Sequence, residues 1–172
     1  MTTDPLTAKL IAYIQDAHAM EKNVLQMLNS MIATAKDADT RERLRVHHEE
    51  TLRHERLLQE RLAAHGKDRS FTTDVAAVAG AMVKGVADQV RSDKAGKTAR
   101  DAYITEHTEI AAYELLERLA RRAGDLETAR VAAEIRHDEE DMARWISNHW
   151  DRFLDQTLAD AGLVPAATAG AV

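Results

Sequence analysis

Apolar side chains recur with a helical period along four long stretches of the chain. In the first stretch, the apolar positions are Leu10, Ile14, Ala17, Val24, Leu28 and Met31. The other three stretches cover residues 39–66, 98–123 and 126–161, and glycine follows or ends each of them. Because apolar positions three or four residues apart share one face of a helix, the pattern predicts four long α-helices.

The connections between these stretches differ in length. Short turns join the first helix to the second and the third to the fourth, so each pair is expected to be antiparallel. Residues 67–97 form a long connection that contains a short, glycine-interrupted amphipathic segment. The sequence therefore predicts an all-α, ferritin-like four-helix bundle over residues 1–161. Its helix pairs are 6–66 and 98–161, its crossover 67–97 contains an extra short helix, and residues 162–172 are a flexible tail.

The chain nearly repeats itself, because residues 10–60 can be laid on residues 98–149. With an offset of 88 residues Glu21 falls on Glu109, and after one inserted residue Glu50 falls on Glu139. Each half is predicted to be a helix pair that carries a glutamate on each apolar face. In helix bundles, two such pairs can bring their buried carboxylates to one centre and form a site for two metal ions there.

Helical phase indicates which carboxylates face the interior. The glutamates predicted on the inner faces are Glu21, Glu106, Glu109 and Glu139. On the second helix His54 lies on the inner face, and Glu50, four residues earlier, lies at its edge. Because an isolated buried carboxylate is unfavourable, so many on inner faces favour divalent cations as their partners.

Other histidines are weaker candidates. Glu134 and His137 have the Glu-x-x-His spacing of dimetal bundles. Their phase nevertheless places His137 on the solvent side of the fourth helix, together with Glu140. Three further histidines are expected to be surface residues or to support the site without binding metal, namely His18, His47 and His107.

Composition and charge exclude several classes of function. The net charge of −6 gives no electrostatic reason to expect nucleic acid or an anionic membrane as a partner. The chain has no cysteine, which excludes disulfides, thiolate metal sites and cysteine nucleophiles. We find neither a signal peptide nor an apolar run long enough to span a membrane, and we expect a cytoplasmic protein.

Three motifs resemble the YciE/YciF-type ferritin-like proteins: DAHAME at Asp16–Glu21, HHEETLRHERLL at His47–Leu58 and TEHTEIAAYELL at Thr105–Leu116. An acidic pair, Glu139-Glu140, follows on the fourth helix. The resemblance covers about residues 6–160. It implies a rubrerythrin-like four-helix bundle with an extra crossover helix, a dimeric state, a dimetal site and a link to stress conditions.

The ligand pattern departs from that of the standard dimetal bundle, in which two helices each supply a Glu and two supply Glu-x-x-His. Here Glu50 and His54 are four residues apart, and Met142 stands three residues after Glu139. Glu106 completes the expected set, with His18 as the alternative. The expected ligands of two iron or manganese ions are therefore Glu21, Glu50, His54, Glu106, Glu109 and Glu139.

Three functions are compatible with this pattern. The first is a dimetal oxidoreductase that acts on peroxide or dioxygen, with an external electron donor if it is a peroxidase. The second is metal binding or iron storage without turnover. The third is a metal-free structural or partner-binding protein, whose inner carboxylates pair with arginines such as Arg53, Arg100 and Arg144. We also expect a homodimer, formed through the crossover helix or through Trp145 and Trp150.

Overall fold

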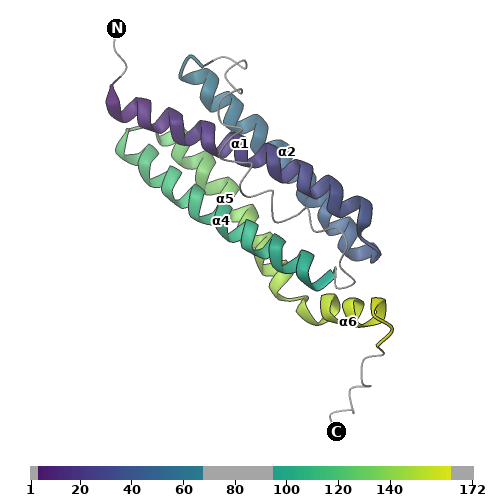
Figure 1. Cartoon of the computed structure of the whole chain (residues 1–172). Helices are drawn as coiled ribbons and strands as arrows, with labels where there is room; N and C mark the ends of the chain where they lie inside the picture. Colours follow the sequence, from purple (N-terminus) through teal and green to yellow (C-terminus); the bar gives the residue numbers. More distant parts are fainter. Residues whose placement is uncertain (1–3, 68–94, 164–172) are drawn as a thin grey trace.

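The computed structural model describes residues 4–67 and 95–163 (Figure 1). These residues form helices α1 (Pro5–Thr34), α2 (Ala38–Ala64), α4 (Ala95–Arg122), α5 (Leu126–Ser147) and α6 (Trp150–Asp160). Helices α1 and α2 lie side by side as one hairpin, and α4 and α5 form a second hairpin against it. The predicted all-α bundle is confirmed. The predicted crossover helix and nearly all of the predicted tail lie outside the described residues.

Aspartate side chains begin three of the helices. Asp4, Asp37 and Asp125 accept the backbone N–H of the residue three positions later, at 3.1, 2.8 and 2.9 Å. Such caps satisfy amide groups that the first turn leaves unpaired. Gly66 follows the end of α2, and Gly124 follows the end of α4. Their φ values of 70° and 74° would be strained in a residue with a Cβ, so glycine suits these helix ends.

The apolar core is divided into two clusters. One packs Leu10, Ile14, Leu58, Leu116 and Ile135 together with their neighbours. The other packs Val24, Leu28, Leu44, Met142 and Ile146. On each of the four long helices, the residues of the first cluster and those of the second are separated by about two to four turns of chain that carry buried polar side chains. The bundle is therefore a polar layer between two apolar layers.

The prediction of one continuous helix over residues 126–161 is wrong. Helix α5 ends at Ser147 and α6 starts at Trp150. His149 accounts for the break locally, because its Nδ1 lies 2.7 Å from the carbonyl oxygen of Trp145 and its ring stacks on the Trp145 ring. After the break, α6 packs against α4, where Thr157 accepts the backbone N–H of Gly96 at 2.9 Å.

The two tryptophans lie at this junction. Trp150 contacts Tyr103 of α4, with ring centroids 5.4 Å apart, and Trp145 contacts Phe153 of α6 at 6.0 Å. None of the helices in the described part of the chain has the length and hydropathy needed to span a lipid bilayer.

Candidate metal centre

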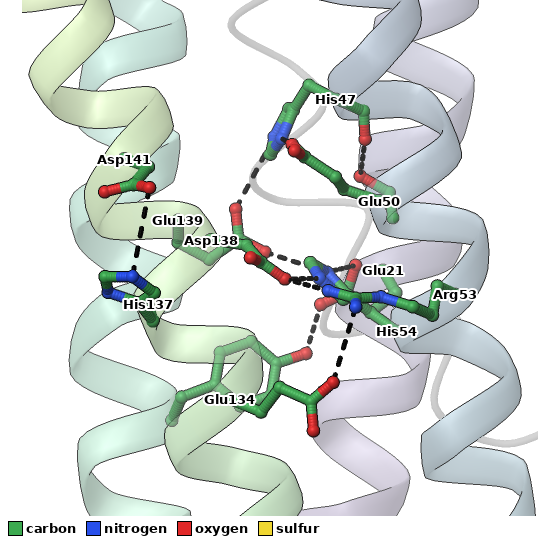
Figure 2. Close-up of polar contacts among 12 residues, drawn as sticks. Glu21, His47, Glu50, Arg53, His54, Glu134, His137, Asp138, Glu139 and Asp141 are labelled. Carbon is green, nitrogen blue, oxygen red and sulfur yellow. Dashed lines mark hydrogen bonds and ion pairs between the residues drawn. The ribbon is translucent and has the colours of Figure 1, made fainter.

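The polar layer holds four carboxylates and two imidazoles that are sealed from solvent. Its members are 0–1% exposed: Glu21, His47, His54, Glu106, Glu109 and Glu139. All four long helices contribute to it, and both histidines come from α2. Because α2 turns once in 3.6 residues, the seven-residue spacing of the two histidines places both on one face. Figure 2 shows both rings directed from α2 toward α5.

The first group of possible ligands is Glu21, His54 and Glu139. His54 Nδ1 lies 3.0 Å from Glu139 Oε1 and 3.6 Å from Glu21 Oε2. The other oxygen of Glu21 accepts a short hydrogen bond from the hydroxyl of Tyr113, a fully buried side chain on α4. Each of the three residues offers one ligand atom, and these atoms lie within 4.8 Å of one another.

The second group is His47, Glu106 and Glu139. His47 Nε2 lies 3.4 Å from Glu106 Oε2 and 3.5 Å from Glu139 Oε2. Glu139 therefore belongs to both groups and turns a different oxygen toward each. A carboxylate placed in this way has the arrangement needed to bridge two cations.

Unpartnered atoms gather in this layer. In the described part of the chain, nine buried side-chain polar atoms make no hydrogen bond, and eight of them belong to the six residues of the layer. Both carboxylate oxygens of Glu109 and both of Glu139 are among them. Buried polar atoms normally have a partner, so a cluster of unpartnered atoms requires an explanation. Carboxylate oxygens and imidazole nitrogens that converge on one another without hydrogen bonds fit hard divalent cations.

The electrostatics of the layer support the same explanation. Burial, followed by repulsion from Glu139, Glu21 and Glu106, raises the pKa of Glu109 well above its usual range. Burial also raises the pKa of Glu21 and of Glu139. Burial alone would lower the pKa of His47, but Glu106, Glu50 and Glu139 raise it to about 10. Without other cations the layer therefore retains protons to offset its negative charge.

Comparison with known proteins places the chain in a family. A family model described as a domain of unknown function, DUF892, matches residues 6–159. The chain belongs to the DUF892 family. The resemblance to YciE/YciF-type proteins is thereby confirmed.

Solved structures agree with this DUF892 assignment. A protein from Xanthomonas campestris pv. campestris is 26% identical with a TM-score of 0.76, over 92% of this chain and 99% of that one. The E. coli stress protein YciF is 16% identical with a TM-score of 0.72, over 91% and 99%. YcfI from Rhodopseudomonas palustris, described as a putative structural protein, is 20% identical with a TM-score of 0.69, over 84% and 94%. These last two likenesses concern the fold alone.

In this DUF892 chain, four of the six predicted ligands fall in the two groups, namely Glu21, His54, Glu106 and Glu139. Glu109 is buried near them but belongs to neither group. The structure does not bring Glu50 into either group. Its side chain is 27% exposed and its carboxylate Oε2 contacts His47 Nδ1 and an Arg43 nitrogen, each at 3.1 Å. His47 takes the place that was expected for Glu50. The signal that could have identified His47 is its seven-residue spacing from His54.

The weaker histidine candidates lie elsewhere. His18 is buried but contacts Glu55 at 3.2 Å, outside both groups. His137 is 69% exposed and lies on the side of α5 away from α2, facing Asp141, as helical phase predicted (Figure 2). The Glu-x-x-His spacing of Glu134 and His137 is thus coincidental.

In the described part of the chain, arginines do not neutralise the inner carboxylates. Arg53 pairs with Asp138 and Glu134, Arg100 pairs with Asp101, and Arg144 pairs with Asp141. Within the described ranges, the ion-pair partners of the inner glutamates are His47 and His54. The arginine pairing expected for a metal-free structural protein is therefore not found among these residues.

Proposed function

We propose that this DUF892 protein binds two divalent cations, iron or manganese, in the polar layer and uses them in redox chemistry with peroxide or dioxygen. The observation that carries the proposal is the pair of buried carboxylate–imidazole groups that share Glu139. A single buried carboxylate has many structural explanations. Two complete groups, each with one imidazole and two carboxylates, have few explanations other than metal binding.

The residues divide naturally between two cations. Glu21 and His54 would hold one, and His47 and Glu106 would hold the other. Glu139 would bridge them, because its Oε1 faces His54 and its Oε2 faces His47. Glu109, whose two oxygens have no hydrogen-bond partner among the described residues, would complete the set.

The donor set agrees with these metals in charge and in type. Four carboxylates carry a total charge of −4 when ionised, which two divalent cations would cancel. Carboxylate oxygens with one imidazole for each cation suit iron or manganese, and the chain offers no thiolate that would select zinc or copper(I). When bound, two redox-active cations supply the electrons and the Lewis acidity that reaction with peroxide or dioxygen requires.

The surrounding protein controls the setting of that chemistry. The two apolar clusters close the layer from both ends of the bundle and exclude water from it. Tyr113 donates its hydroxyl hydrogen to Glu21 and fixes the direction of that carboxylate. Because the chain has no cysteine, a peroxidase cycle would draw its electrons from an external donor, whereas a catalase-like cycle would need none. The similarity of this chain to YciF, which is described as an E. coli stress protein, is consistent with a role under stress.

Metal analysis and peroxide turnover test the proposal. Protein purified without chelator, or loaded anaerobically with Fe²⁺ or Mn²⁺, is expected to contain about two ions per chain. The loaded protein is expected to consume hydrogen peroxide. The Glu21→Ala/Glu109→Ala double variant should lose both properties, while a Glu140→Ala control on the outer face of α5 should keep them. No bound metal in the wild type after loading would refute the proposal, and bound metal without turnover would favour storage.

A further inference from the structure

Each buried histidine is held from outside the centre by a carboxylate. His47 directs Nε2 into the polar layer, while its Nδ1 lies 3.1 Å from Glu50 Oε2. His54 has the opposite orientation: Nδ1 faces the layer, and Nε2 lies 2.9 Å from Asp138 Oδ2. The two rings thus use different nitrogens toward Glu139 and have the same kind of partner on the other side.

An arginine holds each of these carboxylates in turn. Arg43 donates to Glu50 Oε2 at 3.1 Å, the same oxygen that contacts His47. Arg53 donates to Asp138 Oδ2, again the oxygen that contacts the histidine. A series of contacts from an arginine through a carboxylate to an imidazole therefore occurs twice, and both series end in the polar layer. Figure 2 shows the second of these series, in which Arg53 contacts Asp138 and Asp138 contacts His54.

A simpler explanation is that these contacts only clamp helices together. It suits Asp138, since the contacts of this α5 residue with Arg53 and His54 join α5 to α2. It does not suit Glu50, because in the described part of the chain its contacts with Arg43 and His47 lie within α2 and join it to no other helix. Glu50 and Asp138 have one feature in common: each contacts the outward nitrogen of a buried imidazole.

We propose that Glu50 and Asp138 are positioning residues of the metal centre, each of which accepts the outward N–H of one histidine and thereby presents the inward nitrogen as a metal ligand. This inference rests on the proposed metal binding. A neutral imidazole that donates from one nitrogen has its lone pair on the other, so the carboxylate selects the tautomer and fixes the ring. Removal of such a partner typically weakens metal binding by about 10- to 100-fold.

Titration with Co²⁺ tests this inference without depending on turnover, because Co²⁺ reports its ligand field in its visible absorption. The wild type is expected to bind two ions. In Asp138→Ala, the ion held by His54 should bind about 10- to 100-fold more weakly, and in Glu50→Ala the ion held by His47 should do so. Each single variant should therefore weaken one of the two binding steps and change the absorption of that ion.

Matched variants separate positioning from general damage. Glu49→Ala and Asp141→Ala remove exposed carboxylates beside the same positions and should leave both steps unchanged. Asp138→Asn keeps one oxygen that can accept from both Arg53 and His54, so it should recover much of the lost affinity. Far-ultraviolet circular dichroism of the metal-free proteins identifies a variant that fails to fold. In that case Asp138→Asn and the corresponding Glu50→Gln decide the result through a shifted Co²⁺ absorption.

Two outcomes would overturn the inference in different ways. If the wild type binds no Co²⁺, the proposed function fails and this inference fails with it. If the wild type and folded variants at Glu50 and Asp138 bind two ions with equal affinity and equal spectra, the metal centre stands. The two carboxylates would then have no positioning role.

Discussion

The two hairpins of the bundle are near repeats in sequence, yet they supply different chemistry to the centre. Glu21 and Glu109 occupy equivalent positions and are both buried. Glu21 accepts a hydrogen bond from Tyr113, whereas neither oxygen of Glu109 has a hydrogen-bond partner within residues 4–67 and 95–163. Glu139 lies at the middle of the centre, while its counterpart Glu50 lies outside it. The α1–α2 hairpin supplies both imidazoles, and the α4–α5 hairpin supplies the shared carboxylate. A repeat thus preserves helix positions more faithfully than side-chain roles.

The largest contrast between the hairpins is expected at Glu139 and Glu50. Glu139→Ala removes a ligand common to both groups, so we expect the metal content to fall from about two ions per chain to near zero. Glu50→Ala should still bind two ions, one of them more weakly. Elemental analysis after gel filtration measures both. Equal metal loss in the two variants would show that the hairpins contribute symmetrically.

A second contrast concerns stability without metal at Glu109 and Glu21. Glu109→Leu removes a buried carboxyl group whose oxygens have no partner, so we expect the free energy of unfolding to rise by about 1–3 kcal/mol. Glu21→Leu should lower it, because the buried hydroxyl of Tyr113 then loses its acceptor. Urea unfolding in the presence of chelator measures this difference. Excess Mn²⁺ should reverse the gain at Glu109, since the wild type then gains binding energy that the variant lacks.

Tyr113 gives a test of similar size, and its counterpart in the first hairpin is Leu25. In Tyr113→Phe the ring remains but the hydrogen bond to Glu21 is lost, and we expect the free energy of unfolding to fall by about 1.5–3 kcal/mol. Thermal unfolding of metal-free protein measures the change, with Tyr13→Phe on α1 as the control. An unchanged stability would show that Glu21 gains nothing from this contact.

The smallest contrast is between the two helix caps Asp37 and Asp125. Burial alone would raise the pKa of Asp125. Hydrogen bonds from Thr128 and His65 and the charge of Arg61 outweigh it and lower this pKa to about 2. Because an unfolded aspartate has a pKa near 3.9, this carboxylate stabilises the fold above about pH 4 and loses its contribution between about pH 4 and pH 2. Asp125→Ala should cost about 1–2 kcal/mol at pH 7 and progressively less below pH 4.

Asp37 caps α2 in the same way, but the caps differ in their contacts with other helices. Asp125 contacts Arg61 of α2 and His65, which directly follows α2, at 3.2 and 2.8 Å, whereas Asp37 lies 3.5 Å from Arg152. Asp37→Ala should therefore cost only about 1 kcal/mol. Urea unfolding at pH 6 and pH 3 measures both variants. A larger loss at Asp37 would contradict the comparison.

Much of the fold could be predicted because it depends on periodic burial and on short turns. Leu10, Leu28, Leu116 and Ile135 all lie in the core, as their spacing indicates. The break after Ser147 could not be predicted in this way. No proline or glycine marks it, and the stop depends on how the His149 side chain and the aromatic rings of α6 pack.

The centre could be predicted only in part for a similar reason. Phase along one helix places Glu21, Glu109 and Glu139 inside with little ambiguity. On α2, however, His47 lies on the apolar face, and Glu50 lies at its edge only about 60° away, so that phase alone does not exclude Glu50. Which of them enters the centre depends on the neighbouring helices. A buried imidazole backed by a carboxylate is lower in energy there than another carboxylate beside Glu106 and Glu139.

The distribution of ligands over the two hairpins has a consequence for assembly. Glu21, His47 and His54 belong to α1–α2, and Glu106, Glu109 and Glu139 belong to α4–α5. Neither group of possible ligands is complete within one hairpin, because each takes residues from both. Two fragments that carry one hairpin each would thus have weak metal sites when separate and strong ones when joined. Under the proposed function, the cations would stabilise a non-covalent heterodimer of the two fragments. The fragment concentration at which half of them associate would then depend on the metal concentration.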